Sequence, residues 1–117
     1  MRYSYRDTDA REDSSPALDD VSLSVPEGTS CAIVGQTGSG KSTLLRLLCA
    51  LEAPDSGSVV VHGIETSRRR NRRRLHGRVG YVMQRPERQL FAEPVLEDVA
   101  YGPANLGLSR TEAEARA

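Results

Sequence analysis

A stretch from Gly35 to Thr43 carries the residue types that bind a chain of phosphates. It fits the pattern G-x-x-x-x-G-K-[ST] at every fixed position, and we call it the phosphate cradle. Its glycines let the backbone N–H groups approach phosphate oxygens closely. Lys41 can reach the terminal phosphates, and the Ser42 hydroxyl is placed to hold Mg²⁺. The predicted nucleotide-binding residues are Gly35, Gln36, Thr37, Gly38, Ser39, Gly40, Lys41, Ser42 and Thr43.

A strand and a helix must position this cradle. Cys31–Val34 is a continuous apolar run, which is typical of a strand buried on both faces in a parallel sheet. The residues from Lys41 to about Glu52 favour a helix whose leucines surround most of its axis, so we expect it to be buried. Its positive dipole end adds to the charge of Lys41. Cys31 and Cys49 are predicted to be small core residues, which fits a reducing compartment.

The remaining pattern predicts an α/β domain. Pro26-Glu27-Gly28 and Pro54–Gly57 are predicted turns, and residues 7–16 read as an exposed acidic loop. Ser109 and Glu112 form a capping box that opens a helix at Arg110. That helix has no closing signal, so we expect the sequence to be incomplete. Strands are predicted at Tyr3–Arg6, Val21–Val25, Val59–Val61 and Arg78–Met83, and a short helix at Val95–Tyr101.

Composition limits the classes of function. A chain of 117 residues forms one domain or part of one, and its formal net charge of zero gives no overall attraction to nucleic acid or membrane. No apolar run fits a signal peptide or a membrane span, so no direct membrane insertion is expected. Lys41 is the one lysine among 16 basic residues, which makes a chance match to the cradle pattern less probable.

Three further features each allow two interpretations. Arg68–Arg74 is either a patch that contacts nucleic acid or a solvated, partly helical connection, and we favour the second because no aromatic residue is interleaved to stack bases. Tyr5 is either a half-buried packing residue or a platform on which a base stacks. Gln84 either caps the strand before it or contacts a ligand at the sheet edge. The segment Arg85–Phe91 is predicted to be a surface loop that presents the one phenylalanine.

In this order and spacing, the motifs resemble the N-terminal half of the ATPase domain of ABC transporters. The resemblance covers nearly the whole chain and is greatest to the energy-coupling-factor type, which drives uptake of metal ions such as cobalt and nickel or of vitamins. It rests on Ala17–Ser22, the phosphate cradle, Pro54–Gly57, Val79–Gln84, Pro86–Phe91 and Asp98–Pro103.

The resemblance implies a role for several residues. Tyr5 is expected to stack on adenine, and Lys41 and Gln84 are the expected catalytic residues. Gln84 is expected to contact Mg²⁺ together with Ser42, and to contact the attacking water. ATP and Mg²⁺ are the implied cofactors. The Arg85–Phe91 loop is expected to contact transmembrane subunits, which implies a cytoplasmic location on the inner face of the membrane.

The family's ATPases act as head-to-tail dimers, and this sequence departs from their pattern. Leu108-Ser109 continues as Arg110-Thr111, so it is not the LSGGQ-like signature that closes over the partner's nucleotide. The sequence contains no apolar run ending in Asp-Glu and no switch histidine after one. We therefore expect ATP binding without turnover by this chain alone.

The expected fold is a P-loop NTPase-like core with an N-terminal antiparallel β portion, lacking the second half of the parallel sheet. Residues 1–84 would hold the β portion and core, and residues 85–117 the Q-loop and the start of the helical portion. Two other functions stay open: a truncated or degenerate nucleotide-binding fragment without transport activity, and a soluble ABC ATPase that acts on nucleic acid or ribosomes.

Overall fold

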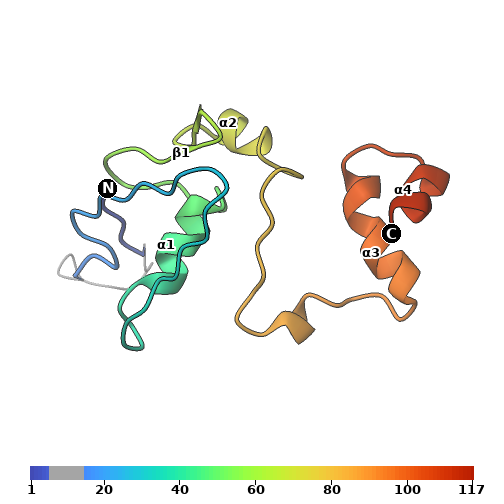
Figure 1. Ribbon diagram of the computed structural model, residues 1–117, viewed down its shortest axis with the longest axis horizontal. Helices are drawn as coiled ribbons and strands as arrows, with labels where there is room; N and C mark the ends of the chain where they lie inside the picture. Colours follow the sequence, from blue (N-terminus) through green and yellow to red (C-terminus); the bar gives the residue numbers. More distant parts are fainter. Residues whose placement is uncertain (6–14) are drawn as a thin grey trace. The chain divides into compact units, whose positions relative to one another are not determined.

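The computed structural model describes residues 1–5 and 15–117, which form two compact units, Met1–Arg74 and Leu75–Ala117 (Figure 1). The first unit contains α1 (Lys41–Leu48), β1 (Val60–Val61), β2 (Ile64–Glu65) and α2 (Arg69–Arg73). The second contains the 3-10 helix η1 (Pro86–Arg88), α3 (Val95–Asn105) and α4 (Arg110–Arg116). None of the helices in the described residues has the length and apolar content that a membrane crossing requires.

The core of the first unit lies along one face of α1. Leu44 and Leu47 of α1 pack with Leu18 and Val59, and all four side chains are buried. Burying such side chains contributes about 1.5–3 kcal/mol each, so this cluster holds α1 to the rest of the unit. The prediction that the leucines bury most of this helix is wrong for Leu45, which is 42% exposed.

The end of α1 is set by a left-handed residue. The helix ends at Leu48 rather than near Glu52, because Ala50 adopts a φ of 57°. The N–H groups of Ala50 and Leu51 then donate to the carbonyls of Leu47 and Arg46. These two bonds form a Schellman motif, which satisfies carbonyls that the helix leaves free.

A hairpin follows the Pro54–Gly57 turn. β1 pairs with β2 antiparallel, with Val61 opposite Ile64. His62 and Gly63 connect them with φ values of 46° and 72°, the positive values that a type I′ turn requires. The predicted strand at Val59–Val61 is therefore confirmed for Val60 and Val61, and its predicted end near Gly63 is confirmed. β2 is too short for its pattern to have been recognised.

The N-terminus pairs with two distant segments rather than forming a regular strand. Arg2 and Tyr3 make isolated antiparallel bridges to Ser56 and Leu18. The predicted strand at Tyr3–Arg6 is therefore reduced to its first residue, and Arg6 lies outside the described residues. The predicted acidic loop at residues 7–16 also lies outside them, except for Ser15 and Pro16.

Three predicted strands are not formed. Val21–Val25, Cys31–Val34 and Arg78–Met83 have no strand beside them among the described residues. The prediction of a buried strand before the cradle is wrong in this structure, since Cys31 is exposed and Val34 is 89% exposed. A strand of a parallel sheet obtains both its hydrogen bonds and its burial from neighbours. Cys49 is half-buried, and this burial raises the pKa of its thiol.

The arginine-rich segment is largely solvated, as predicted. α2 has no buried residue, and Arg68, Arg69, Arg70, Arg73 and Arg74 are exposed. Arg72 differs from them, because its Nη1 donates to the carbonyls of Thr66 and Ser67, each at 2.9 Å. Asn71 donates to the Glu65 carbonyl at 2.8 Å. These two side chains fasten α2 to the hairpin.

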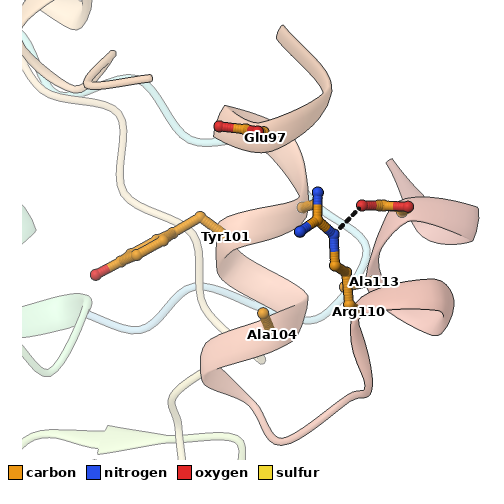
Figure 2. A pocket seen from close by; sticks show the side chains of 7 residues that line it. Glu97, Tyr101, Ala104, Arg110 and Ala113 are labelled. Atoms are coloured by element: carbon orange, nitrogen blue, oxygen red, sulfur yellow. Dashed lines mark hydrogen bonds and ion pairs between the residues drawn. The ribbon is translucent and has the colours of Figure 1, made fainter. Parts of the chain in front are cut away.

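The second unit is built on the pair α3 and α4. The predicted capping box is confirmed, with Ser109 and Glu112 bonded reciprocally. α3 begins at Val95 as predicted but runs to Asn105, one turn further. Ala100 and Ala113 are buried where the two helices approach each other. Figure 2 shows the open groove beside this contact, where Arg110 donates to Glu114 at 2.7 Å.

We predict that Ala50→Gly leaves the free energy of unfolding within about 1 kcal/mol of its starting value. Glycine avoids the strain of a left-handed φ, which costs a residue with a side chain about 1–2 kcal/mol. Glycine also gives the unfolded chain more freedom, at about 0.4–1 kcal/mol, and removes the buried Ala50 methyl group, at about 0.8 kcal/mol, so these effects offset each other. Urea denaturation followed by circular dichroism measures the change. Ala50→Val is the control and should destabilise the chain clearly, because a β-branched residue resists a positive φ; a valine variant as stable as the glycine variant would contradict the assigned conformation.

Candidate functional site

The phosphate cradle meets α1 at Gly40, the N-cap residue. Gly40 has a φ of 83°, and a Cβ there would lie 2.5 Å from the Ala17 carbonyl oxygen and 2.8 Å from Leu18 Cδ2. Both distances are shorter than real Cβ contacts, so a side chain would displace the helix from the core. The glycine therefore fixes where the N-terminus of α1 lies.

A second glycine lets the cradle fold back on itself. Gly35 has a φ of 156°, and a Cβ there would lie 2.9 Å from Ser39 Oγ. The absence of this side chain allows the two ends of the loop to approach each other, which curves the backbone between them. Such a curved backbone is the geometry in which successive N–H groups surround an anion.

The ammonium group of Lys41 closes the loop. Its Nζ donates to the carbonyl oxygens of Gly35 and Gln36 at 2.9 and 2.6 Å, and lies 3.3 Å from Ser39 Oγ. All three contacts are exposed to solvent. The positive charge is thus held within the cradle, where water or an incoming anion can reach it.

The N-terminus of α1 offers further donors. Among the described residues, none accepts a hydrogen bond from the backbone N–H of Lys41, Ser42 or Thr43, and Gly40 provides no side-chain cap. The Ser42 side chain is exposed. Free N–H groups, a helix dipole and an ammonium group converge here, so the residues present fit a phosphate group with an attached Mg²⁺.

Tyr5 contacts the first turn of α1. Its hydroxyl lies 2.8 Å from Thr43 Oγ1, and its ring meets the Tyr3 ring edge-on, with centroids 5.2 Å apart. Half of the Tyr5 residue remains exposed. Tyr5 thus contacts Thr43, the last residue of the cradle, although the two residues are 38 positions apart in the sequence.

Tyr3, which contacts the Tyr5 ring, lies near a charged pair. Arg46 and Glu52 form an ion pair, and the Glu52 side chain is only 17% exposed. Burial of the Tyr3 hydroxyl, followed by the effect of the neighbouring Glu52 carboxylate, raises the Tyr3 pKa to about 12. Tyr3 therefore stays neutral at physiological pH and serves as packing for its neighbour.

Gln84 belongs to the second unit and is exposed. The backbone just before it is held by a side chain that the sequence pattern did not single out. Gln89 accepts from the Met83 N–H at 3.0 Å and donates to the Tyr81 carbonyl at 3.1 Å. The Gln89 amide thus forms the hydrogen bonds to this backbone that a neighbouring strand would form in a sheet. Gln89 lies five residues after Gln84, a spacing that matches neither helix nor strand periodicity, so the sequence did not predict the contact.

The loop after Gln84 exposes its apolar residues as predicted. Leu90 and Phe91 are 68% and 62% exposed. Asp98 of α3 accepts from the N–H groups of Phe91 and Ala92 at 3.0 and 3.2 Å. The Phe91 ring also packs edge-on against Tyr101 with centroids 4.5 Å apart. The exposed apolar residues are thus presented on a loop fastened to α3.

Residues 18–116 match the ABC transporter family. This chain therefore belongs to the ABC transporter family, whose ATPase domains have the P-loop NTPase fold.

Several relatives are named as ATP-binding proteins of transporters or of import. The chain is 50% identical over 101 residues to the energy-coupling factor transporter ATP-binding protein EcfA2 of Symbiobacterium thermophilum, which covers 86% of this chain and 35% of that protein. It is 52% identical over 101 residues to the cobalt import ATP-binding protein CbiO of Rhodobacter capsulatus, covering 86% and 36%. EcfA2 of Streptococcus thermophilus is 48% identical over 104 residues, covering 86% and 37%.

These relatives confirm the resemblance to the energy-coupling-factor type. The chain spans little more than a third of the length of these three proteins.

We predict that Gly40→Ala destabilises the first unit more than Gly38→Ala. Both glycines have a φ near 84°, so both substitutions incur about 1–2 kcal/mol of backbone strain. Only at Gly40 does the new Cβ also meet Ala17 and Leu18, which should add about 1–3 kcal/mol of overpacking. Urea denaturation of the two variants measures the difference. Equal losses would mean that Gly40 is not packed as described.

Proposed function

We propose that this chain is the ATP-binding part of an ABC-type transport ATPase that couples ATP binding and hydrolysis to substrate uptake through membrane partners. The observation that carries the proposal is the position of the Lys41 ammonium, within 3.3 Å of three cradle oxygens and beside the free N–H groups of α1. A polyphosphate offers oxygens that replace these acceptors and also fill the unused donors.

Each predicted residue has a role in this proposal. The cradle backbone and Lys41 bind the phosphates, the Ser42 hydroxyl holds Mg²⁺, and Tyr5 stacks on adenine. Bound Mg²⁺ neutralises phosphate charge and polarises the phosphoryl oxygens. By family resemblance, Gln84 is the second group that contacts the metal and orients the attacking water. Lys41 and Gln84 are thus the proposed catalytic residues.

Hydrolysis requires groups that these 117 residues do not include. The proposal therefore assigns nucleotide binding to this chain and turnover to a complete head-to-tail dimer. In this proposal, residues 1–84 correspond to the β portion and nucleotide-binding core of the family's ATPase domain, and residues 85–117 to the Q-loop and the start of its helical portion.

The exposed Arg85–Phe91 loop supports a role in contacting transmembrane subunits, since apolar side chains fastened on a loop are suited to a partner surface. The proposed location is cytoplasmic, at the inner face of the membrane, without nucleic acid as a partner.

We predict that Lys41→Ala lowers the affinity for a fluorescent ATP analogue by about 100-fold, because hydrogen bonds to a charged group contribute about 1.5–3 kcal/mol. Fluorescence anisotropy with Mg²⁺ present measures the loss. Arg73→Ala is the matched control, because it also removes one exposed positive charge, and the Arg73 side chain forms no hydrogen bond or ion pair with the described residues. Arg72 is unsuitable as a control because its side chain bonds α2 to the carbonyls of Thr66 and Ser67, so its loss would also affect folding. Equal losses for Lys41 and Arg73 variants would overturn the site assignment.

We predict that Tyr5→Ala weakens ATP binding by about 0.5–1.5 kcal/mol, the contribution of aromatic stacking. Binding of inorganic pyrophosphate, which has no base, should be unchanged. Isothermal titration calorimetry with both ligands compares the two effects. A matched loss for pyrophosphate would show that Tyr5 acts through folding of the unit instead.

A further inference from the structure

We infer that the outward face of α2 binds anionic phospholipid headgroups, so that the first unit contacts a membrane surface without inserting into it. The face consists of Arg69, Arg70, Arg73 and Arg74, and we call it the arginine face. The inference concerns a surface separate from the nucleotide site, but it rests on the proposed function, which puts the chain at the inner face of a membrane.

The spacing of residues along α2 gives the helix two different faces. Successive residues of an α-helix lie 100° apart around its axis, so the four members of the arginine face share an arc of about 140°. Arg74, the C-cap residue, keeps helical backbone angles and so continues the arc. The middle of the arc lies opposite Asn71 and Arg72. These two residues are half-buried, whereas all four members of the arginine face are exposed.

The opposite face fastens α2 to the β1–β2 hairpin beside it (Figure 1). Arg72 Nη1 donates to the carbonyls of Thr66 and Ser67, each at 2.9 Å. Asn71 Nδ2 donates to the carbonyl of Glu65 at 2.8 Å. These bonds fix which side of the helix faces outward. The arginine face is therefore preorganised, and binding an extended surface does not require the backbone beneath it to become ordered.

The charge of the arginine face is not neutralised within the described residues. None of the ion pairs there involves an arginine of residues 68–74. Glu65 is the only acidic residue between positions 60 and 74, and its carboxylate already accepts from the N–H and the hydroxyl of Ser67 at 2.9 and 2.6 Å. Six arginines and one carboxylate thus share this segment, a local excess that the net charge of zero conceals.

The composition and exposure of the face favour a lipid surface over nucleic acid or a small ligand. Residues 66–74 include no aromatic or large apolar side chain, so the face can neither stack bases nor enter a bilayer. Small-molecule sites are concave, whereas these arginines project from the outer side of a helix. Their long side chains let four guanidinium groups reach phosphates in one plane. Clusters of about four to eight basic residues beside the inner leaflet attract its anionic lipids.

The test is co-sedimentation of the 117-residue chain with vesicles of phosphatidylcholine, with and without the anionic lipid phosphatidylglycerol. The chain should bind the mixed vesicles and not phosphatidylcholine alone, and binding should fall as salt rises because exposed charges are screened. The Arg70→Gln/Arg73→Gln variant removes the two central charges of the face. It should weaken binding about 25-fold, since each arginine near an anionic surface contributes about fivefold.

The matched control is Arg78→Gln/Arg116→Gln, which removes two exposed positive charges outside the arginine face. It should keep most of the binding, and circular dichroism should show that both variants are folded. Equal losses for the two variants would mean that net charge, and not this face, drives binding, which would overturn the inference. So would a failure to bind the mixed vesicles, including a result in which only single-stranded RNA binds and the Arg70→Gln/Arg73→Gln variant loses it.

Binding of a fluorescent ATP analogue separates this inference from the proposed function. The Arg70→Gln/Arg73→Gln variant should bind the analogue as tightly as the unsubstituted chain, because neither residue belongs to the cradle. If Lys41→Ala leaves binding of the analogue unchanged, the proposed function fails. If Lys41→Ala abolishes it while the unsubstituted chain ignores the anionic vesicles, only the lipid-binding inference fails.

Discussion

The close contact between Gly40 and the Ala17 carbonyl is the constraint on which the first unit depends. Because no side chain separates them, α1 approaches the segment before the cradle and packs Leu44 and Leu47 against Leu18. The same contact fixes the free N–H groups at the start of the helix. Core packing and anion binding therefore share one residue, and a change at Gly40 affects both.

The Lys41 ammonium group lies within the cradle, where its contacts contribute little to the free energy of folding. Its contacts to carbonyl oxygens are exposed, and exposed polar interactions contribute little to stability because water competes for them. An arriving phosphate can replace them with stronger charge-assisted bonds. The cradle is thus preorganised by its backbone, while its lysine is free to exchange partners.

Both units leave large apolar side chains exposed. Val34 and Val82 lie in extended segments that the pattern predicts as strands, and both are exposed. Such segments have the composition of a parallel sheet, in which each strand depends on neighbours. Membership of the ABC transporter family, together with the coverage of about a third of the relatives' length, explains why these residues read as buried strands. In the second unit the exposed Phe91 is instead held in place by Asp98 and Tyr101.

The sequence by itself determined the features whose causes are local. The cradle, the start of α1 at Lys41, the turn near Gly63 and the capping box at Ser109 follow from residues within a few positions of one another. Only the tertiary structure decided which segments find partners. Among the described residues it left Cys31–Val34 and Arg78–Met83 without neighbouring strands, exposed one side of α1 and half-buried Glu52 near Tyr3. It also joined Tyr5 to Thr43 and Gln89 to the backbone before Gln84, because contacts between distant residues leave no periodic trace in a sequence.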